Sequence, residues 1–287
     1  MNGVFMLAKR NALCYFRDRA SVFFSLMAVL IVIMLYLLFL RNLLIDSMMT
    51  GLEFASSDQI SNLVDSWVLA GILGIVSVTS SAGSLQCMVD DRVSGKNLDF
   101  MITPMKPYQL ASSYILSTFF VGLIMSVITL GITLAFLLAT GCILDGTAII
   151  TCVALLIPST LSGSIIIFAL ISFIKSQGAF SGFFTVLSTM IGFLTGIYMP
   201  MGNLPAAMQT LGSLMPATHM AALFRQNLSS GAMEDVFGPY DTTEFRKEMG
   251  FDLSIGGFDF TPESSMIYVI AVTAIFFVIS VIIIKKK

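Results

Sequence analysis

Six long runs of apolar residues constrain this chain more than any other feature, because each is long enough to cross a membrane. About 20 mainly apolar residues in a helix cross the roughly 30 Å hydrocarbon core of a bilayer. Since backbone polar groups find no water there, each run is expected to be helical. The chain is therefore predicted to be an all-α integral membrane protein with six transmembrane helices. The runs contain no charged residue and cover residues 22–40, 66–88, 110–139, 147–174, 180–200 and 266–284.

The composition excludes a soluble domain. The 287 residues are 56% hydrophobic and 11% charged, whereas soluble domains carry roughly 25% charged residues. The four cysteines form no C-x-x-C pair and no ligand cluster, so we interpret them as small apolar residues and expect no metal site. The start of the chain lacks the basic tip and apolar core of a cleavable signal peptide. Membrane lipid is an expected partner, and nucleic acid is not.

Charge asymmetry between the links predicts the orientation. Of the 15 Lys and Arg residues, 11 lie before the first run, between the second and third, between the fourth and fifth, or in the tail. The other links hold 13 of the 17 acidic residues. Basic residues favour the cytoplasmic side of a membrane. Both termini are therefore expected in the cytoplasm, with the chain in the cell (inner or plasma) membrane.

The segment before the first run, residues 1–21, is too polar to span. Its apolar residues recur at helical spacing while basic residues occupy the other positions, which favours an amphipathic helix lying in the inner interface. A frayed basic end is the alternative. The apolar positions are Phe5, Ala8, Ala12, Tyr15 and Phe16, and the charged ones include Lys9, Arg10, Arg17 and Asp18.

The longest non-spanning segment, residues 201–265, has two halves of different character. The first is apolar and is interrupted by Pro205 and Pro216. It is expected to form one or two re-entrant helices in the outer leaflet, shielded by protein. The second half, residues 229–263, is acidic and rich in glycine. It is too short for an independent core, so we expect a cap packed on the bundle.

Catalytic chemistry is missing from the sequence. The stretch Ser94-Gly-Lys-Asn97 resembles part of a nucleotide loop, but Asn97 replaces the required Ser or Thr and Asp90 replaces the first Gly. The single histidine, His219, lacks an evident partner for acid–base work and is interpreted as a structural hydrogen-bonding residue. We therefore expect no catalytic residue, no enzyme activity and no cofactor bound by this chain.

Two small-residue patterns within the runs have alternative interpretations. Gly178 with Gly182 and Gly192 with Gly196 allow close helix approach, either inside the bundle or at a seam between chains. The second run carries hydroxyls near its inner half. They either satisfy neighbouring backbone groups or line a polar path. These residues are Thr79, Ser80, Ser81 and Ser84.

The polar link at residues 89–109 interrupts two apolar runs and carries its own apolar stripe. Leu98, Met101 and Ile102 recur at helical spacing, followed by Met105. Thr103 precedes Pro104, which disfavours a helical conformation there. A short helix ending near Ile102 is predicted, with an apolar face to offer a partner. The alternative is a solvated loop packed on its own membrane domain.

Three stretches together resemble the ABC-2 type permeases, the membrane subunits of ATP-binding-cassette exporters. They are YFRDRASVFFSL (15–26), DDRVSGKNLDFMITPMKPYQLASSYIL (90–116) and TGIYMPMGNLPAAMQTLGSLMPATHMAALFRQNLSSG (195–231). One departure is Lys96, which stands where the family usually has Thr after Gly95. The residues that carry the resemblance are Asp91, Arg92, Gly95, Thr103 and Pro104 in the second stretch, and Gly196, Asn203, Pro205, Pro216 and Arg225 in the third.

The resemblance implies one ABC-2 type transmembrane domain over residues 1–287, paired with a second permease half that is a copy or a sister chain. Two cytoplasmic ATPase subunits would bind ATP and Mg and drive transport. The link after the second run would be a coupling helix docked on an ATPase, and the interfacial helix would contact it through Phe16, Arg17 and Asp18. The expected docking residues are Asp91, Arg92, Gly95, Leu98, Met101, Ile102, Thr103 and Pro104.

The resemblance also implies outward movement of a hydrophobic or amphipathic substrate. Apolar surfaces and 19 adaptable methionines favour a drug, a hydrophobic peptide or a lipid-like molecule. A secondary transporter is the first alternative, disfavoured because the runs contain no charge and no duplicated half is evident. A non-transporting immunity or scaffold protein is the second.

Overall fold

The computed structural model describes residues 2–52, 54–96, 105–142 and 144–285. Within them, six helical stretches are long and apolar enough to span a membrane, which confirms the all-α membrane fold. The spans are built from α2 (Arg19–Leu35) with the π turn η1 (Tyr36–Leu40) and α3 (Arg41–Gly51), α4 (Ser57–Ser84) with α5 (Gln86–Val93), α7 (Pro107–Ala139), α8 (Gly146–Ile171), α9 (Gln177–Leu194) and α14 (Pro262–Lys285).

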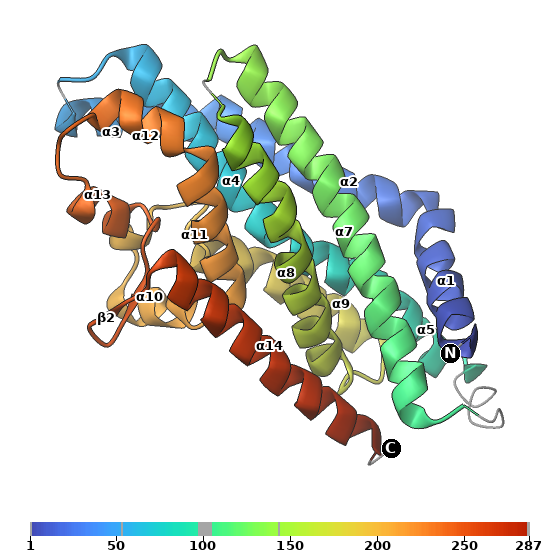
Figure 1. Cartoon of the computed structure of the whole chain (residues 1–287). Helices are drawn as coiled ribbons and strands as arrows, with labels where there is room; N and C mark the ends of the chain where they lie inside the picture. The colour runs from blue at the N-terminus through green and yellow to red at the C-terminus, as the bar shows by residue number, and fades with distance from the viewer. Residues whose placement is uncertain (1, 53, 97–104, 143, 286–287) are drawn as a thin grey trace.

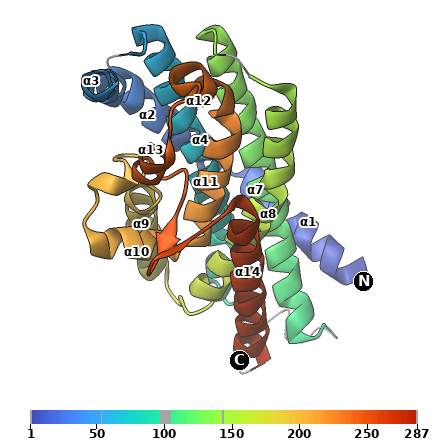
Figure 2. The ribbon, with the colours of Figure 1, turned by 60° about the vertical axis from the view of Figure 1, so that its left-hand side comes forward.

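The remaining elements are short. They are α1 (Asn2–Arg17), the 3-10 turn η2 (Met201–Asn203), α10 (Ala206–Ser213), α11 (Pro216–Leu228), α12 (Ser230–Phe237), α13 (Thr243–Glu248) and the antiparallel strands β1 (Ser254–Ile255) and β2 (Phe258–Asp259). Both chain ends, α1 and α5 lie at one end of the bundle, whereas α3 and α12 lie at the other (Figure 1). The turned view in Figure 2 shows the same separation of the two ends.

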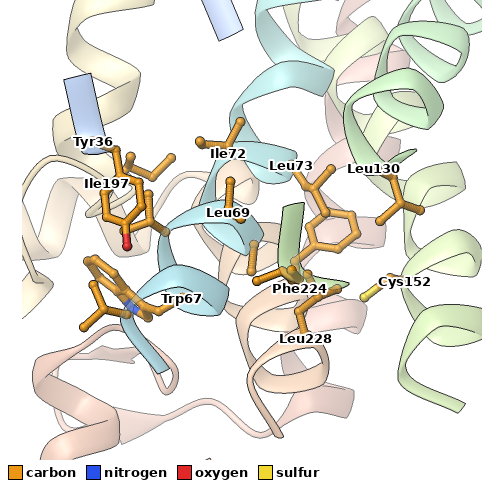
Figure 3. Packing of buried hydrophobic residues seen from close by; sticks show 14 of the residues in the cluster. Tyr36, Trp67, Leu69, Ile72, Leu73, Leu130, Cys152, Ile197, Phe224 and Leu228 are labelled. Atoms are coloured by element: carbon orange, nitrogen blue, oxygen red, sulfur yellow. The ribbon is translucent and has the colours of Figure 1, made fainter. Parts of the chain in front are cut away.

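Helix α4 forms the centre of the bundle and contacts α7, α8, α11 and α3. It begins with a capping box, in which the Ser56 hydroxyl accepts the backbone N–H of Gln59 and the Gln59 side chain accepts that of Ser56. Gly74 allows α11 to cross closely, because a Cβ there would lie 2.9 Å from the Cα of Ala221. The core around this crossing joins α4 to α11, α7 and α8 (Figure 3). It includes Trp67, Leu69, Leu73, Leu130, Cys152, Phe224 and Leu228.

The predicted span boundaries need three corrections. The first helix continues beyond residue 40 to Gly51, the second begins at Ser57 rather than at residue 66, and the fifth ends at Leu194. The longer first span includes Arg41 and Asp46 and the longer second span includes Asp65, so the prediction of spans without charge is wrong for both helices. Hydropathy marks an end at a charged residue, but a helix continues through one whose charge is paired.

A π turn in the first span places two side chains on the same acid. The backbone N–H of Arg41 bonds to the carbonyl of Tyr36, a bond over five residues. Residues five apart in an α-helix lie about 140° apart around the axis, whereas a π turn stacks them. As a result the Tyr36 hydroxyl and the Arg41 guanidinium both reach Asp65 of α4. The extra residue in this turn therefore fixes the first span against the second.

Helix α1 is a separate helix packed on α7, as expected of an interfacial element. Its buried side includes Leu7, Ala8 and Tyr15. Phe5, predicted on the same face, is instead 56% exposed, because the face toward α7 is rotated from the one that the periodicity indicated.

The segment after the fifth span enters the bundle further than predicted. Helix α11 has ten buried residues among its 13 and packs against α4, α8 and α14. Leu211, in the half predicted to be apolar and shielded by protein, is 55% exposed on α10. The cap lies on this segment: Trp67 donates its indole N–H to the carbonyl of Met249 at 2.7 Å, and Gln226 donates to that of Phe251 at 2.6 Å.

Candidate coupling site and translocation cavity

Asp91 joins three helices at the end of the bundle that carries the chain termini. Its buried carboxylate accepts two hydrogen bonds from the Arg10 guanidinium, at 2.5 Å from Nη1 and 2.8 Å from Nη2. The Tyr114 hydroxyl donates a third bond at 2.8 Å. The hydrogen bonds to Asp91 raise the pKa of Arg10. Helices α1, α5 and α7 are therefore tied together at one carboxylate, where charge-assisted, bidentate bonds are the strong kind.

Arg92, the next residue, ties α5 to the turn between α8 and α9. Its Nη1 lies 2.9 Å from the carbonyl oxygen of Ile174, 3.2 Å from that of Ser172 and 3.3 Å from that of Ile171. These carbonyls lie at the carboxyl end of α8, which lacks intrahelical donors and carries partial negative charge. The guanidinium therefore stabilises the carboxyl end of α8 and ties it to α5.

Both charged residues predicted for ATPase docking thus bond within their own chain. Gly95 ends this helix with a φ of +75°, which favours glycine. Leu98, Met101, Ile102, Thr103 and Pro104 lie outside the described residues, so the docking role stays a prediction. Of the interfacial residues, Phe16 is half-buried against Tyr15, Arg17 is exposed, and the Asp18 carboxylate accepts the backbone N–H of Ala20 at the start of α2.

Two residues of the predicted outer motif meet in the core. Arg225 is fully buried and donates to the carbonyl of Gly196 at 3.1 Å and to that of Gly250 at 3.4 Å. Its guanidinium carbon lies 4.6 Å above the Trp67 ring, a cation–π contact. Gly196 has a φ of +71°, the left-handed conformation in which chains commonly leave a helix. The backbone therefore turns away from α9 at this residue. The buried cation therefore holds α4, α11, the end of α9 and the cap together.

The other motif residues lie along the same segment and mark the boundaries of its helices. Asn203 ends η2, Pro205 precedes α10 and Pro216 is the first residue of α11. Proline fits these positions because the first turn of a helix needs no N–H donor there. No hydrogen bond or ion pair joins these three to Arg225 in the described part of the chain, so the motif comprises one contact site and three helix boundaries.

His219 is buried and fully hydrogen-bonded. Its Nε2 lies 2.8 Å from the carbonyl oxygen of Ser213, which only accepts, so Nε2 carries the proton. Nδ1 then accepts from the Ser265 hydroxyl at 3.2 Å. Phe260 and Tyr268 pack against the ring. Burial lowers the pKa of His219 to about 4, and these contacts support a structural role for it.

We expect His219 to make stability depend on pH. The unfolded histidine has a pKa of about 6.5, so below that value the unfolded state binds more protons than the folded one. Stability should fall as the pH drops from 6.5 toward 4, by roughly 2 kcal/mol between pH 7 and pH 5. Thermal unfolding in detergent should show this slope in the natural protein. His219→Asn should have a smaller slope, and equal slopes would contradict the assignment.

A triad around Asp65, at the end of the bundle opposite to the chain termini (Figure 1), was missed in the sequence. Its side chain is fully buried and accepts from the Tyr36 hydroxyl at 2.5 Å and from Arg41 Nε at 2.8 Å and Nη2 at 3.1 Å. The capping box at Ser56 and Gln59 was the available signal, because it starts the helix early enough to include Asp65. The same central span thus carries a buried ion pair near each end.

A cavity of about 460 Å³ lies among α1, α2, α4, α7 and α9 and includes Tyr198 beyond the end of α9. Its lining is mainly apolar, with hydroxyl and amide groups, and Thr79 and Ser80 are among them. Both hydroxyls also bond to carbonyls of their own helix. The first interpretation, that these hydroxyls satisfy backbone groups, is therefore confirmed at both positions, and a polar path stays a prediction. The lining comprises Tyr15, Ala20, Val29, Val32, Ile72, Ile75, Val76, Thr79, Ser80, Gly83, Gln86, Met125, Phe184, Ser188 and Tyr198.

The two glycine pairs of the fifth run have different surroundings. Gly178 and Gly182 are exposed, and a Cβ at either would meet no atom within 4 Å. Gly192 is buried, and a Cβ there would lie 2.2 Å from the Tyr198 ring. The second pair therefore serves packing and turning within the chain, and the first leaves a smooth patch on α9 without a neighbour among the described residues.

These features define a class of protein: a multi-pass membrane protein of six helical spans, held at both ends of its central helix by buried ion pairs. The sequence of residues 42–284, most of the chain, matches the ABC-2 family of transporter proteins. The chain belongs to this family, which confirms the resemblance and makes it a membrane permease of an ABC transporter. A comparison with curated proteins finds no significant match.

Proposed function

We propose that this permease is one half of an exporter that moves a hydrophobic or amphipathic substrate outward, driven by separate ATPase subunits. The pair of contacts at Asp91 and Arg92 carries the proposal. These residues lie in the predicted coupling segment, residues 89–109, and they hold α1, α7 and the α8–α9 turn. A displacement of that segment by an ATPase would therefore reach several spans at once. The chain itself binds no cofactor, and ATP and Mg belong to the partner.

Through the contacts of Asp91 and Arg92, a displacement of the coupling segment can also reach the cavity. Helix α4, which continues into α5, supplies more of the residues that line the cavity than any other helix. Helices α2 and α9 form its other walls and have mostly exposed faces. We propose that the cavity is part of the substrate route, and that the whole chain forms one membrane domain with both termini in the cytoplasm. The excess of Lys and Arg at that end supports this orientation.

The exposed face of α9 is our proposed seat for the second permease half. Small residues let helix backbones approach closely in a membrane, and Gly178 and Gly182 leave such space open. The chain's other mainly exposed spans carry larger apolar side chains suited to lipid, such as Leu38 of the first and Ile270 of the last. The partner half is either a second copy or a sister chain.

A matched pair of substitutions tests this seat. Gly182→Leu should abolish or strongly weaken permease pairing while leaving the fold intact, because the added side chain meets no atom of its own chain. Gly192→Leu should instead impair folding, since it collides with Tyr198. Native mass spectrometry and cross-linking in nanodiscs would measure pairing, and thermal unfolding would measure the fold. Normal pairing of the Gly182 variant would exclude this face.

Copurification tests the proposal as a whole. The permease expressed with the neighbouring genes should carry with it a subunit that has a nucleotide-binding loop, and ATP hydrolysis in the complex should depend on the permease. Met101→Asp should weaken the association at least about tenfold by placing a charge in the predicted apolar docking face. Membrane insertion of the variant should be normal. Absence of any such subunit would refute the exporter, and full association of the variant would refute docking through Met101.

The two alternative functions, a secondary transporter and a non-transporting protein, require different features of the chain. A secondary transporter needs ionisable groups that bind and release a coupling ion, but Asp65 is fully engaged by Tyr36 and Arg41. A non-transporting immunity or scaffold protein would copurify without an ATPase, and changes at Asp91 would leave its activity unaltered. The family membership supports the exporter over both.

A further inference from the structure

The geometry points to an uncharged substrate: a drug-sized apolar molecule that carries hydrogen-bond donors, such as an amide or alcohol, and no formal charge. This inference rests on the proposed function, because it assigns a chemical class to the cavity placed on the substrate route. The cavity volume of about 460 Å³ falls within the roughly 300–1,000 Å³ typical of small-molecule sites.

The first argument is the lack of charge in the lining. Every lining side chain in the described part of the chain is apolar, hydroxyl-bearing or an amide. The ionic groups near the two ends of the central span are already paired, Asp65 with Arg41 and Asp91 with Arg10. A charged ligand group buried in such a cavity would lose its hydration without gaining a counter-ion, and that desolvation is costly. Anionic and cationic cargo are both disfavoured.

The second argument concerns the direction of the hydrogen bonds that the wall offers. Ser80 donates its proton to the carbonyl of Val76 at 2.5 Å, and Ser188 donates to that of Phe184 at 2.7 Å. Thr79 donates to carbonyls of its own helix at 3.3 and 3.4 Å. A hydroxyl whose proton is used in this way still has lone pairs. These three aliphatic hydroxyls therefore act as acceptors and favour a ligand that donates N–H or O–H, whereas the Gln86 amide of the same wall can both donate and accept.

The third argument is the amphipathic arrangement of the lining. The polar groups Thr79 and Ser80 lie toward the end of α4 that continues into α5, and Gln86 is the first residue of α5. The opposite stretch of α4 contributes Ile72, Ile75 and Val76. A ligand with one polar end and one apolar end fits this order, its donors directed toward the end of the bundle that holds the chain termini.

The test uses the full-length permease in lipid nanodiscs without any ATPase. Three probes share one polycyclic aromatic skeleton and differ only in the terminal group, which is a primary amide, a quaternary ammonium or a sulfonate. Binding is measured by equilibrium dialysis with empty nanodiscs subtracted, so that partition into lipid is removed. The amide probe should bind at least about tenfold more tightly than either charged probe. Equal or tighter binding of a charged probe would overturn the inference.

Two variants and a control make the result specific to the cavity. Ser188→Trp should reduce amide binding at least about tenfold by filling the space, and Thr79→Asp should shift preference to the ammonium probe. Ile270→Trp, on the exposed face of α14, should change neither affinity. Unchanged selectivity in Thr79→Asp, with normal thermal unfolding, would place the binding elsewhere. Because no ATPase is present, a failure here leaves the copurification test of the exporter untouched, and the reverse is equally true.

Discussion

Replacement of Asp65 by alanine is expected to destabilise the protein by about 3–5 kcal/mol, because it leaves the Arg41 charge without its partner beside a buried tyrosine hydroxyl. The Asp65 side chain is fully buried, whereas that of Arg41 is 28% exposed. Much of the expected loss in the free energy of unfolding therefore comes from the hydrogen bonds that the buried carboxylate accepts, and not from a surface ion pair. Reversible unfolding of the detergent-solubilised protein, followed by circular dichroism, would measure the change.

Graded variants separate the charge from the hydrogen bonds at this site. Tyr36→Phe removes one hydrogen bond and should cost about 1–3 kcal/mol. The double variant Asp65→Leu with Arg41→Met should recover part of the stability, because a buried ion pair replaced on both sides is often nearly neutral. An alanine variant within about 1 kcal/mol of the natural protein would show that the triad contributes little, since a buried pair broken on one side should cost more than that.

Replacement of Asp91 by alanine is the second large effect. The variant loses both bonds from Arg10 and the bond from Tyr114, so α1 and α7 are no longer tied to α5 at that carboxylate. If the proposed coupling is correct, substrate transport in reconstituted vesicles should fall at least about tenfold, an effect of about 1.4 kcal/mol or more on the transport step. ATPase copurification should persist, because the Asp91 carboxylate bonds within its own chain and the predicted apolar docking face is unchanged.

Controls for this variant use the two partners separately. Tyr114→Phe removes a single hydrogen bond and should reduce transport only slightly. The exchange Arg10→Asp with Asp91→Arg should restore part of the transport that either single change loses, and a double-mutant cycle would give the coupling between the pair. Full transport by Asp91→Ala, with normal expression, would refute the role of this contact in transmission.

The number of spans and their helical form followed from length and hydropathy, because lipid leaves the backbone no other way to pair its polar groups. The boundaries of the spans could not be predicted from hydropathy, because it averages over side chains and misses a charge that is paired in three dimensions. Asp65 shows this: its partners lie 24 and 29 residues away in sequence. No local pattern indicates that they converge on it.

The candidate site was likewise only partly predictable from the sequence. The motif residues around Gly196 and Arg225 were found by order and spacing, and the structure brings those two into contact. The bonds of Asp91 to Arg10 and Tyr114 lie 81 and 23 residues apart in sequence. A charged residue in a polar link is expected to face water or a partner, whereas here the packing of α1 on α7 turns it inward.

The sequence by itself determined that this protein lies in a membrane, and it determined the six-span helical architecture, the charge asymmetry and the family. Each of these depends on composition and order along the chain. Only the tertiary structure decided which charges are buried in pairs, which glycine pair packs inside and which lies open, and that an uncharged cavity lies among α1, α2, α4, α7 and α9. These features depend on contacts between segments distant in sequence, and their energies come from excluding water and lipid at places that only the packed bundle creates.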